Sequence, residues 1–503
     1  MQTVSKPMRA VARGAMAPAL VATIALCGPA VAQSMSASEA WDGLQTLAGE
    51  AGLSISTTGV NEAGGVVTLS GVRIFPTNDP NEVVVSMDQM RIEARGDQVA
   101  LIPAPTVSVA VQTGRGVTRE FEVTHSGEIV GMVDDENAVL DMDFASLAAR
   151  MLPTLSAKGA PMPGRFAMDF DAFDASLRAT SEGSLDFSLG ADSVTYDIEY
   201  VDPSRSNGAT VTQTGTMDAP RITFAGTELD MLSDEPGMMA RAFDAGFSAV
   251  LDFTTAGSEQ SSSQTLDDVP LLMNTQGAQS TMRIAALDGR VDLTGSAGSA
   301  EISGSYGPMQ GAATFGGADV AFGFPLIVTP DDQQFRYMFA LNDIEISQDL
   351  LTMMGAGSFA GDSLSVVLDL GAMGRLTQEL GPEWADSDVP PLDISSVSLD
   401  DLRLAVGDSV LTGSGAVELI GGLMAQMGRP MPEANGDFTF DLVGGERLLT
   451  RLQAMGVIPQ DQLFVVRMMM NGFARSVGED HLRSDVAIRP GAQITVNGAP
   501  LPF

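Results

Sequence analysis

The sequence has a single cysteine, Cys27, among 503 residues. Cys27 lies inside an N-terminal stretch that we expect to be removed as a leader, and Leu26 before it is too large for the small position that precedes a lipidated cysteine. The mature chain is therefore expected to have no thiol, no disulfide and no thiolate metal ligand. Its fold must be stabilised by the core alone.

Histidine, tryptophan and tyrosine are also scarce, which argues against a zinc site and against a site that stacks sugar rings. His125 and His481 are the two histidines, and neither has a second ligand at the spacing of a zinc site. Trp41, Trp384 and four tyrosines are few for a site that stacks sugar rings. Paired carboxylates for glycoside hydrolysis stay open, because an acidic chain offers many pairs.

No catalytic motif is present in the sequence. A G-x-S-x-G elbow is absent, and Gly413-Ser414-Gly415 is instead expected to be a tight turn. The phosphate-binding glycine loop with its lysine is missing too, and Lys158 lies in a loop-like AKGAP segment. We expect a non-catalytic protein without a cofactor or metal.

Positive charge is sparse. The chain has 27 Lys and Arg against 64 Asp and Glu, a formal charge of −37. Nucleic-acid binding takes most of its affinity from cationic contacts to phosphate, so this composition excludes it. A solvated, self-repelling surface that keeps a large β protein soluble explains the charge.

The longest apolar stretch is at the N-terminus, and no run after Ala32 approaches the roughly 20 residues of a membrane span. Residues 1–32 predict a cleavable signal peptide: three cations at the start, an apolar run over 15–26, and Ala30-Val31-Ala32 before Gln33. The alternative is a membrane anchor. The predicted location is the periplasm, with the outer membrane second.

Alternation of apolar and polar residues dominates the rest of the chain and predicts strands with one buried face. Examples are Val83-Val85-Met87, Phe166-Met168-Phe170 and Val194-Tyr196-Ile198-Tyr200. Expected turns between strands include Ser261-Ser262-Ser263 and the hairpin signal Asn497-Gly498.

Few helices are predicted, and all are amphipathic. The first opens at Ser36 with Glu39 as a capping box and places Ala40, Trp41, Leu44 and Ala48 on one face. A second runs over 446–455 and ends at Gly456, and a third begins at Pro459 and runs toward Met470. The last two predict a helical hairpin packed on the sheet.

One short pattern recurs as an apolar alternation, a polar pair, and then apolar-charged-apolar. Its copies are VTLSGVRI (67–74), VSMDQMRI (85–92), FALNDIEI (339–346) and VSLDDLRL (397–404). Their spacing is irregular, so they predict duplicated strand units in an extended sheet rather than a solenoid.

The fold class predicted from these features is a β-rich α+β protein. It has an extended, curved, mostly antiparallel sheet with covering helices and a C-terminal helical hairpin. Prolines and acids break the pattern in GPEWADSDVPPL, so residues 381–392 are interpreted as a linker. The predicted regions are then 33–380 and 393–503.

Clusters of acidic residues invite comparison with calcium sites. They are Asp134-Asp135-Glu136, Asp141 with Asp143, and Asp169-Asp171-Asp174. None fits the twelve-residue calcium loop. Alternation explains the last one more simply, because Asp169 and Asp171 share a strand face opposite Phe166, Met168 and Phe170.

A methionine-rich patch falls on the last predicted helix. It consists of Phe464, Met468, Met469, Met470 and Phe473. Such residues can form an adaptable apolar contact surface for lipid or for a partner helix. The simpler expectation is that they pack in the core of the helical hairpin.

The C-terminal segment resembles the bacterial domain-of-unknown-function family 2125. The likeness is carried by VSLDDLRL with GDSVLTGSG, by GGERLLTRLQAMGVIP and by the ending PGAQITVNGAPL, and FALNDIEISQDLLTMM is similar as well. The resemblance implies an exported Gram-negative protein, distantly similar in strand pattern to AsmA-type envelope proteins, which handle lipid on long curved sheets. Those proteins usually keep an N-terminal membrane anchor. This chain differs from them, because its leader is predicted to be cleaved.

The functional expectation is a non-catalytic envelope protein that binds acyl chains along an apolar sheet face, with lipid or envelope proteins as partners. An outer-membrane β-barrel is the alternative, opposed by Pro500 and Pro502 in the last strand and by a 6% aromatic content. A periplasmic enzyme that uses carboxylates is the second alternative.

Overall fold

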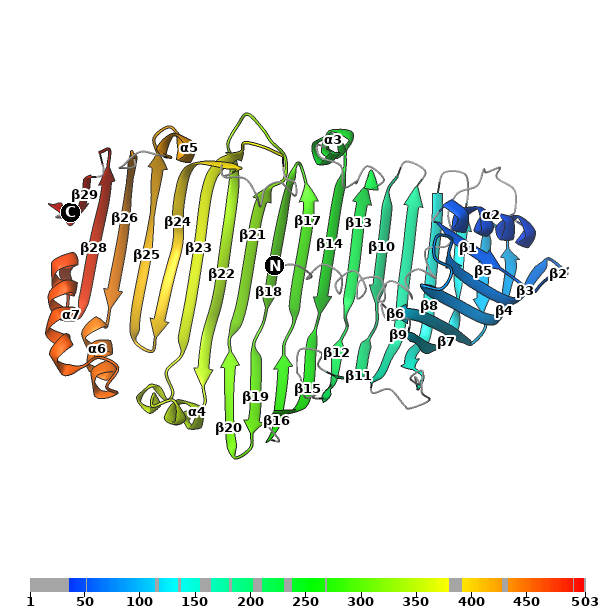
Figure 1. The fold of residues 1–503 in the computed structure, drawn as a ribbon, viewed down its shortest axis with the longest axis horizontal. Coiled ribbons are helices and arrows are strands. Elements are labelled where there is room, and N and C mark those ends of the chain that lie inside the picture. The colour runs from blue at the N-terminus through cyan, green and yellow to red at the C-terminus, as the bar shows by residue number, and fades with distance from the viewer. Residues whose placement is uncertain are drawn as a thin grey trace. The chain divides into compact units, whose positions relative to one another are not determined.

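The computed structural model describes residues 36–50, 52–113, 117–133, 137–153, 164–180, 183–201, 210–229, 238–266, 269–379, 391–427, 433–491 and 493–501. The predicted signal peptide, the acidic cluster 134–136, Lys158 and most of the predicted linker lie outside these residues. The described part is a β-rich α+β fold (Figure 1).

The chain divides into two compact units. Unit 1 comprises Met1–Asp230 and Leu251–Leu272, and unit 2 comprises Met231–Val250 and Met273–Phe503. The chain passes between them within β14 (Ser248–Thr255) and β16 (Val269–Gly277).

Unit 1 is an antiparallel sheet with one covering helix. Its elements are α2 (Ala37–Glu50), β1 (Leu53–Ser56), β2 (Gly59–Ala63), β3 (Val66–Pro76), β4 (Val83–Arg95), β5 (Gln98–Pro103), β6 (Thr106–Thr113), β7 (Val117–Val133), β8 (Asn137–Met151), β9 (Arg165–Thr180), β10 (Leu185–Gly190), β11 (Ser193–Val201), β12 (Thr210–Asp218), β13 (Arg221–Thr227) and β15 (Gly257–Leu266). The pairing runs from β1 and β2 on β3 through β7, β8 and β9 to β12 with β15.

The predicted first helix is confirmed by α2. The Ser36 backbone N–H donates to Glu39 Oε2 at 2.8 Å, and the Glu39 N–H donates to Ser36 Oγ at 3.2 Å, so the capping box is formed. The four predicted face residues are all buried, and α2 packs on β1, β3 and β4. This contact covers the main core of unit 1.

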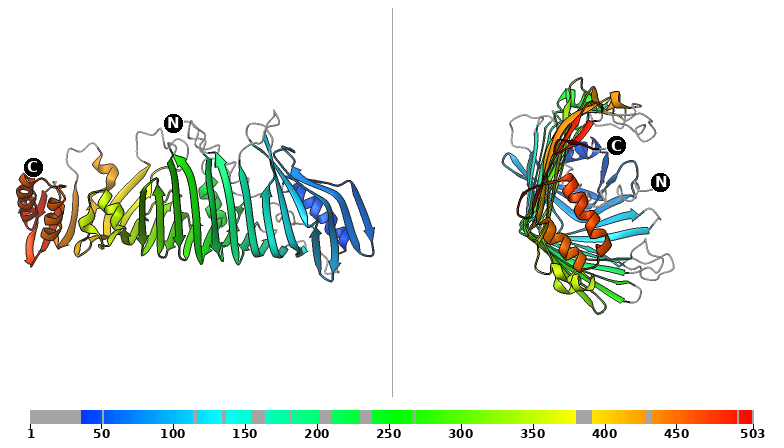
Figure 2. Two further views of the ribbon diagram at one scale, coloured as in Figure 1. Left: turned by 90° about the horizontal axis from the view of Figure 1, so that it is seen from below. Right: turned by 90° about the vertical axis from the view of Figure 1, so that its left-hand side faces the viewer.

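Unit 2 is also built of antiparallel strands, with helices at the strand ends. Its elements are α3 (Met238–Ala245), β17 (Ser280–Leu287), β18 (Arg290–Ala297), β19 (Ala300–Tyr306), β20 (Met309–Phe315), β21 (Gly317–Pro325), β22 (Gln333–Ile346), α4 (Gln348–Met353), η2 (Gly357–Phe359), β23 (Leu364–Leu376), β24 (Leu392–Val406), β25 (Ser409–Leu419), α5 (Gly422–Gln426), β26 (Ala434–Val443), α6 (Gly445–Ala454), α7 (Gln460–Phe473), β27 (Arg475–Gly478), β28 (His481–Arg489), β29 (Gln493–Val496) and β30 (Ala499–Pro500). Figure 2 shows that the strands from β21 to β26 bend along their length, so this sheet is curved.

The recurrent pattern is a strand whose regular pairing is interrupted at its polar pair. In the first two copies, which pair with each other, Gly71 and Asp88 are both left out of the pairing between Ser70↔Gln89 and Val72↔Met87, and the register is unchanged. Register shifts occur at the same place in the other two copies, between Leu341 and Ile344 and between Leu399 and Leu402. In these last two copies the bulge adds a residue to one strand, so apolar side chains on both sides of it stay on one face.

Two predicted turns are wrong. Ser261-Ser262-Ser263 lies within β15, where it pairs with residues 212–214 of β12, because the ladder of backbone hydrogen bonds outweighs the turn preference of serine. Gly413-Ser414-Gly415 lies within β25. A Cβ on Gly415 would come within 2.6 Å of Phe438, so glycine is needed for close packing rather than for a turn.

The C-terminal elements follow the prediction closely. Asn497 and Gly498 form the tight turn between β29 and β30, both with positive φ (50° and 79°). The helical hairpin is formed by α6 and α7, which contact each other, and Pro459 precedes α7. The strands on the two sides of the predicted linker, β23 and β24, pair directly with each other.

Candidate functional site

The sheet of unit 2 has one continuous apolar face, built from rows of residues that lie opposite each other on successive strands. The central row crosses ten strands. It consists of Ile284, Leu293, Phe322, Tyr337, Leu370, Leu399, Gly415, Phe438, Val486 and Val496. Directly opposed residues project from the same face, so this row is uninterrupted by any polar side chain other than the Tyr337 hydroxyl.

Two further rows extend this face along the strands. One includes Val320, Phe339, Leu368 and Leu402, and the other includes Val366, Leu404, Leu411 and Leu442. These three rows are called the apolar face below. Its aromatic rings pack together, with Phe322 stacked on Phe324 at 6.3 Å between centroids.

Much of the apolar face is in contact with solvent. The exposed fraction is 44% for Phe322, 46% for Tyr337, 40% for Leu404, 37% for Val320 and 36% for Val397 on the same face. An antiparallel sheet normally turns its apolar side toward a core and its polar side toward water. Exposed apolar side chains grouped in this way indicate an interaction surface.

The opposite face of the same sheet is polar and paired. Arg336 Nη2 lies 2.9 Å from Asp369 Oδ2, and Arg489 Nη2 lies 2.8 Å from Asp437 Oδ1. On this face Ala321 lies between Thr294 and Met338 and is only 5% exposed. The two faces therefore differ in chemistry, and the apolar one is the candidate for binding an apolar ligand.

The predicted methionine-rich patch lies on α7, and four of its five residues are exposed. Phe464 is 74% exposed, Met468 58%, Met469 53% and Phe473 45%. The expectation that these side chains pack in the core of the hairpin is therefore wrong. Leu463 is the buried anchor of α7 instead, and Met470 Cε lies near Gly445 of α6.

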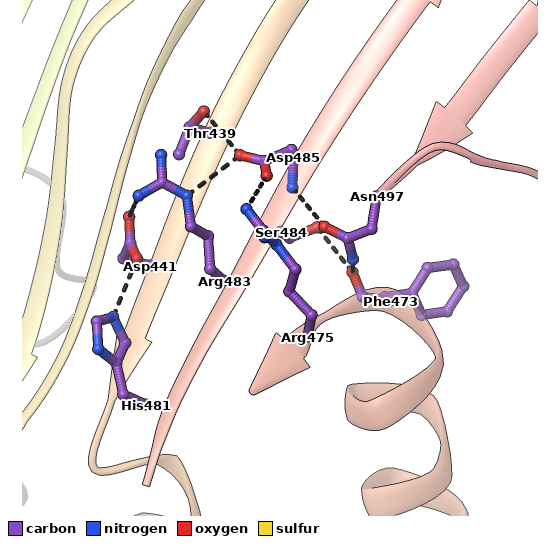
Figure 3. Close-up of polar contacts among 9 residues, drawn as sticks. All are labelled: Thr439, Asp441, Phe473, Arg475, His481, Arg483, Ser484, Asp485 and Asn497. Carbon is purple, nitrogen blue, oxygen red and sulfur yellow. Dashed lines mark hydrogen bonds and ion pairs between the residues drawn. The ribbon is translucent and has the colours of Figure 1, made fainter. Parts of the chain in front are cut away.

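The end of α7 is held in place by side chains from β28 and from the last hairpin. The Phe473 carbonyl oxygen accepts hydrogen bonds from Ser484 Oγ (2.8 Å) and Asn497 Nδ2 (3.2 Å), as Figure 3 shows. Farther along α7, Arg467 Nε donates to Glu446 Oε2 of α6 at 2.9 Å. The exposed side of α7 is thus presented on a fixed helix.

A polar network continues from this end of α7 across the polar face. Asp485 accepts from Arg483 Nε (3.2 Å) and from Arg475 Nη2 (2.6 Å), and the hydrogen bond from Arg483 contributes most to lowering the pKa of this carboxyl (Figure 3). His481 Nε2 lies 3.0 Å from Asp441 Oδ1. Each charge in the network is neutralised by a partner, an arrangement that orders the strand ends.

The remaining titratable candidates have structural partners. His125 Nε2 lies 2.9 Å from the Ala104 carbonyl oxygen, its ring contacts Phe144, and burial lowers its pKa. Asp169 and Asp171 share a face opposite Phe170, as predicted, and Asp169 pairs with Arg150. In the described part of the chain, no three His, Cys, Asp or Glu side chains are grouped so that they could hold a metal ion.

The apolar face was not predicted residue by residue from the sequence. Alternation identifies which side chains share a face within one strand, but the rows depend on cross-strand register. The sequence does hint at the register through the polar pair of the recurrent pattern. At this pair the alternation of apolar and polar residues shifts by one position.

Comparisons with known proteins give no relative. No family model matches the chain, and neither a curated protein nor a solved structure is similar to it. Within the described residues, no helix is both long enough and apolar enough to cross a membrane.

Proposed function

We propose that this protein binds the acyl chains of lipids along the apolar face of unit 2, as a non-catalytic protein of the bacterial envelope. The observation that carries the proposal is the central row, which is apolar across ten successive strands and in which Phe322 and Tyr337 are exposed. Exposed apolar surface of this kind is costly in water, and a bound acyl chain would remove it from water.

The dimensions of the row favour an elongated ligand. Neighbouring strands are spaced by about 4.8 Å, so a row over ten strands is roughly 43 Å long. One leaflet of a bilayer has an acyl region of about 15 Å. The apolar face therefore has room for more than one acyl chain placed end to end, and a compact ligand would cover only part of it.

The same interpretation agrees with the predicted export. The signal peptide predicted from the sequence would direct the protein to the periplasm, where lipids must cross an aqueous space. The resemblance to family 2125 and the distant likeness to AsmA-type proteins stay predictions, and both would fit a lipid-handling role.

The first test is the lipid content of the protein itself. The full chain would be purified from its membrane-free fraction without detergent and extracted for mass spectrometry. We expect acyl lipid at a fixed molar ratio to protein. A protein free of acyl species that also shows no saturable binding of added fatty acid would contradict the proposal.

A second test places the ligand on the correct face. Tyr337→Trp puts an indole on the apolar face, and a fatty acid brominated along its chain quenches tryptophan fluorescence on contact. Thr294→Trp is the matched control, because Thr294 is exposed on the polar face of β18. We expect saturable quenching in the Tyr337→Trp protein beyond that of the parent protein, which contains Trp41 and Trp384, and no additional quenching in the Thr294→Trp protein. Equal quenching of both introduced indoles would contradict binding to the apolar face.

A further inference from the structure

We propose that the exposed side of α7 binds to the surface of a lipid bilayer, lying in the plane of the interface with its apolar side chains inserted. This second surface is distinct from the apolar face, and binding there does not require the proposed function of that face. The exposure, placement, charge and area of the α7 residues support the proposal.

The exposed residues form one stripe. At 3.6 residues per turn, Phe464, Val465, Met468, Met469 and Phe473 fall within one half of the helix circumference. All five are at least 45% exposed. A helix on a protein surface normally turns polar residues outward, whereas α7 exposes these five apolar side chains on the side that also carries Asp461 and Gln462 in its first turn.

The helix is attached on its other side and at its end. Leu463 is buried, Arg467 is bound to Glu446, and the Phe473 carbonyl oxygen accepts two side-chain hydrogen bonds. Insertion of the stripe therefore needs no rearrangement of α7, which lowers the cost of binding.

The charge around α7 permits approach to a bilayer, although the chain as a whole is strongly acidic. Between positions 445 and 491 the sequence has six arginines and five acidic residues. All six arginines are in ion pairs, three of them with Asp362, Asp437 and Asp441 outside this range, so the surroundings of α7 carry no excess of positive charge and insertion rests on the apolar side chains. Charges more than about 8 Å away are screened at physiological ionic strength, so the acidic remainder of the chain contributes little at this site.

The area of the stripe argues against a second copy of the chain as the occupant. Even at ~200 Å² for each whole side chain, the exposed parts of the five residues amount to about 550 Å², below the ~800 Å² per partner of a standard interface. An interfacial helix has no such requirement, since lipid fits around each side chain.

Vesicle flotation with the full chain tests this inference. The probe is a phosphatidylcholine vesicle at 0.15 M salt, with and without added phosphatidylglycerol. We expect the protein to float with both vesicles and the double variant Phe464→Ser/Met468→Ser to lose at least about tenfold in partitioning. The matched control is Met353→Ser/Met354→Ser, which removes two exposed methionines (54% and 66%) at the end of α4. It should float like the parent protein.

Several outcomes would overturn the inference. They are an absence of flotation, unchanged flotation of the α7 variant, or an equal loss in the α4 control. A concentration-dependent dimer in sedimentation that only the α7 variant abolishes would instead assign the stripe to a second copy. Circular dichroism would verify that both double variants are folded.

The two proposals can fail independently. Fatty-acid quenching of the Tyr337→Trp protein is measured without vesicles, so adding the α7 double substitution should leave it unchanged. Flotation measures α7 whether or not a ligand occupies the apolar face.

Discussion

Replacing Phe322 with serine tests whether the apolar face binds acyl chains. Phe322 is the third of the ten residues of the central row, between Leu293 of β18 and Tyr337 of β22, and it is 44% exposed. Its ring is therefore divided between contacts with the sheet and surface available to a ligand. The substitution Phe322→Ser removes both parts, and they can be measured separately.

The expected loss of binding free energy follows from the exposed fraction of the Phe322 side chain. A phenylalanine presents ~200 Å², so about 90 Å² is available to an acyl chain. At ~25 cal/mol per Å² this corresponds to about 2 kcal/mol of binding free energy, or about a thirtyfold increase in Kd. The half that already contacts the sheet predicts a loss of about 2–3 kcal/mol in unfolding free energy.

The assay is a titration of delipidated protein with a fluorescent fatty acid, together with urea unfolding. Thr294→Ala is the control, because Thr294 is on the polar face opposite Ala321. We expect its Kd to stay within about twofold of the parent value. A Phe322→Ser protein that is folded and binds with the parent Kd would refute the reasoning, as would an equal loss in the control.

Substitutions at four other positions test the described structure by urea unfolding. Ser36→Ala removes the capping box with Glu39 and should cost about 0.5–2 kcal/mol, whereas Ser36→Asp should retain most of the stability. Burial lowers the pKa of His125, so its unfolded form binds a proton more readily; unfolding free energy should fall from pH 7 to pH 5, and more steeply than in His125→Gln. Gly472→Ala in α7 should stabilise by about 0.5–1 kcal/mol, because no atom lies within 4 Å of the added Cβ. Gly498→Ala should instead destabilise by about 1 kcal/mol, because Gly498 has a φ of 79°. A destabilised Gly472→Ala or a neutral Gly498→Ala would contradict the described backbone.

Local patterns in the sequence were sufficient for the individual elements. The capping box at Ser36 and Glu39, the helix that begins after Pro459 and the Asn497-Gly498 turn are set by interactions within a few residues. Such interactions can be inferred from residue type and spacing alone. The strand assignments rest on period-two alternation, which is also local.

The failures came from contacts between distant segments. The serine run 261–263 is in a strand because β12 pairs with it, and Gly415 is in a strand because Phe438 packs over it. Whether the apolar side chains of α7 are buried or exposed depends on which of them the sheet covers. None of these outcomes is specified by the composition of the segment itself.

By itself, the sequence determined that this is an acidic β-rich protein with a few amphipathic helices, because charge, alternation and caps act locally. Only the tertiary structure decided which side chains meet across strands. Register between the strands aligns Phe322, Tyr337 and Leu370 in one row, in which Phe322 and Tyr337 are exposed. A shift of one residue in any strand would have moved its apolar side chains to the polar face.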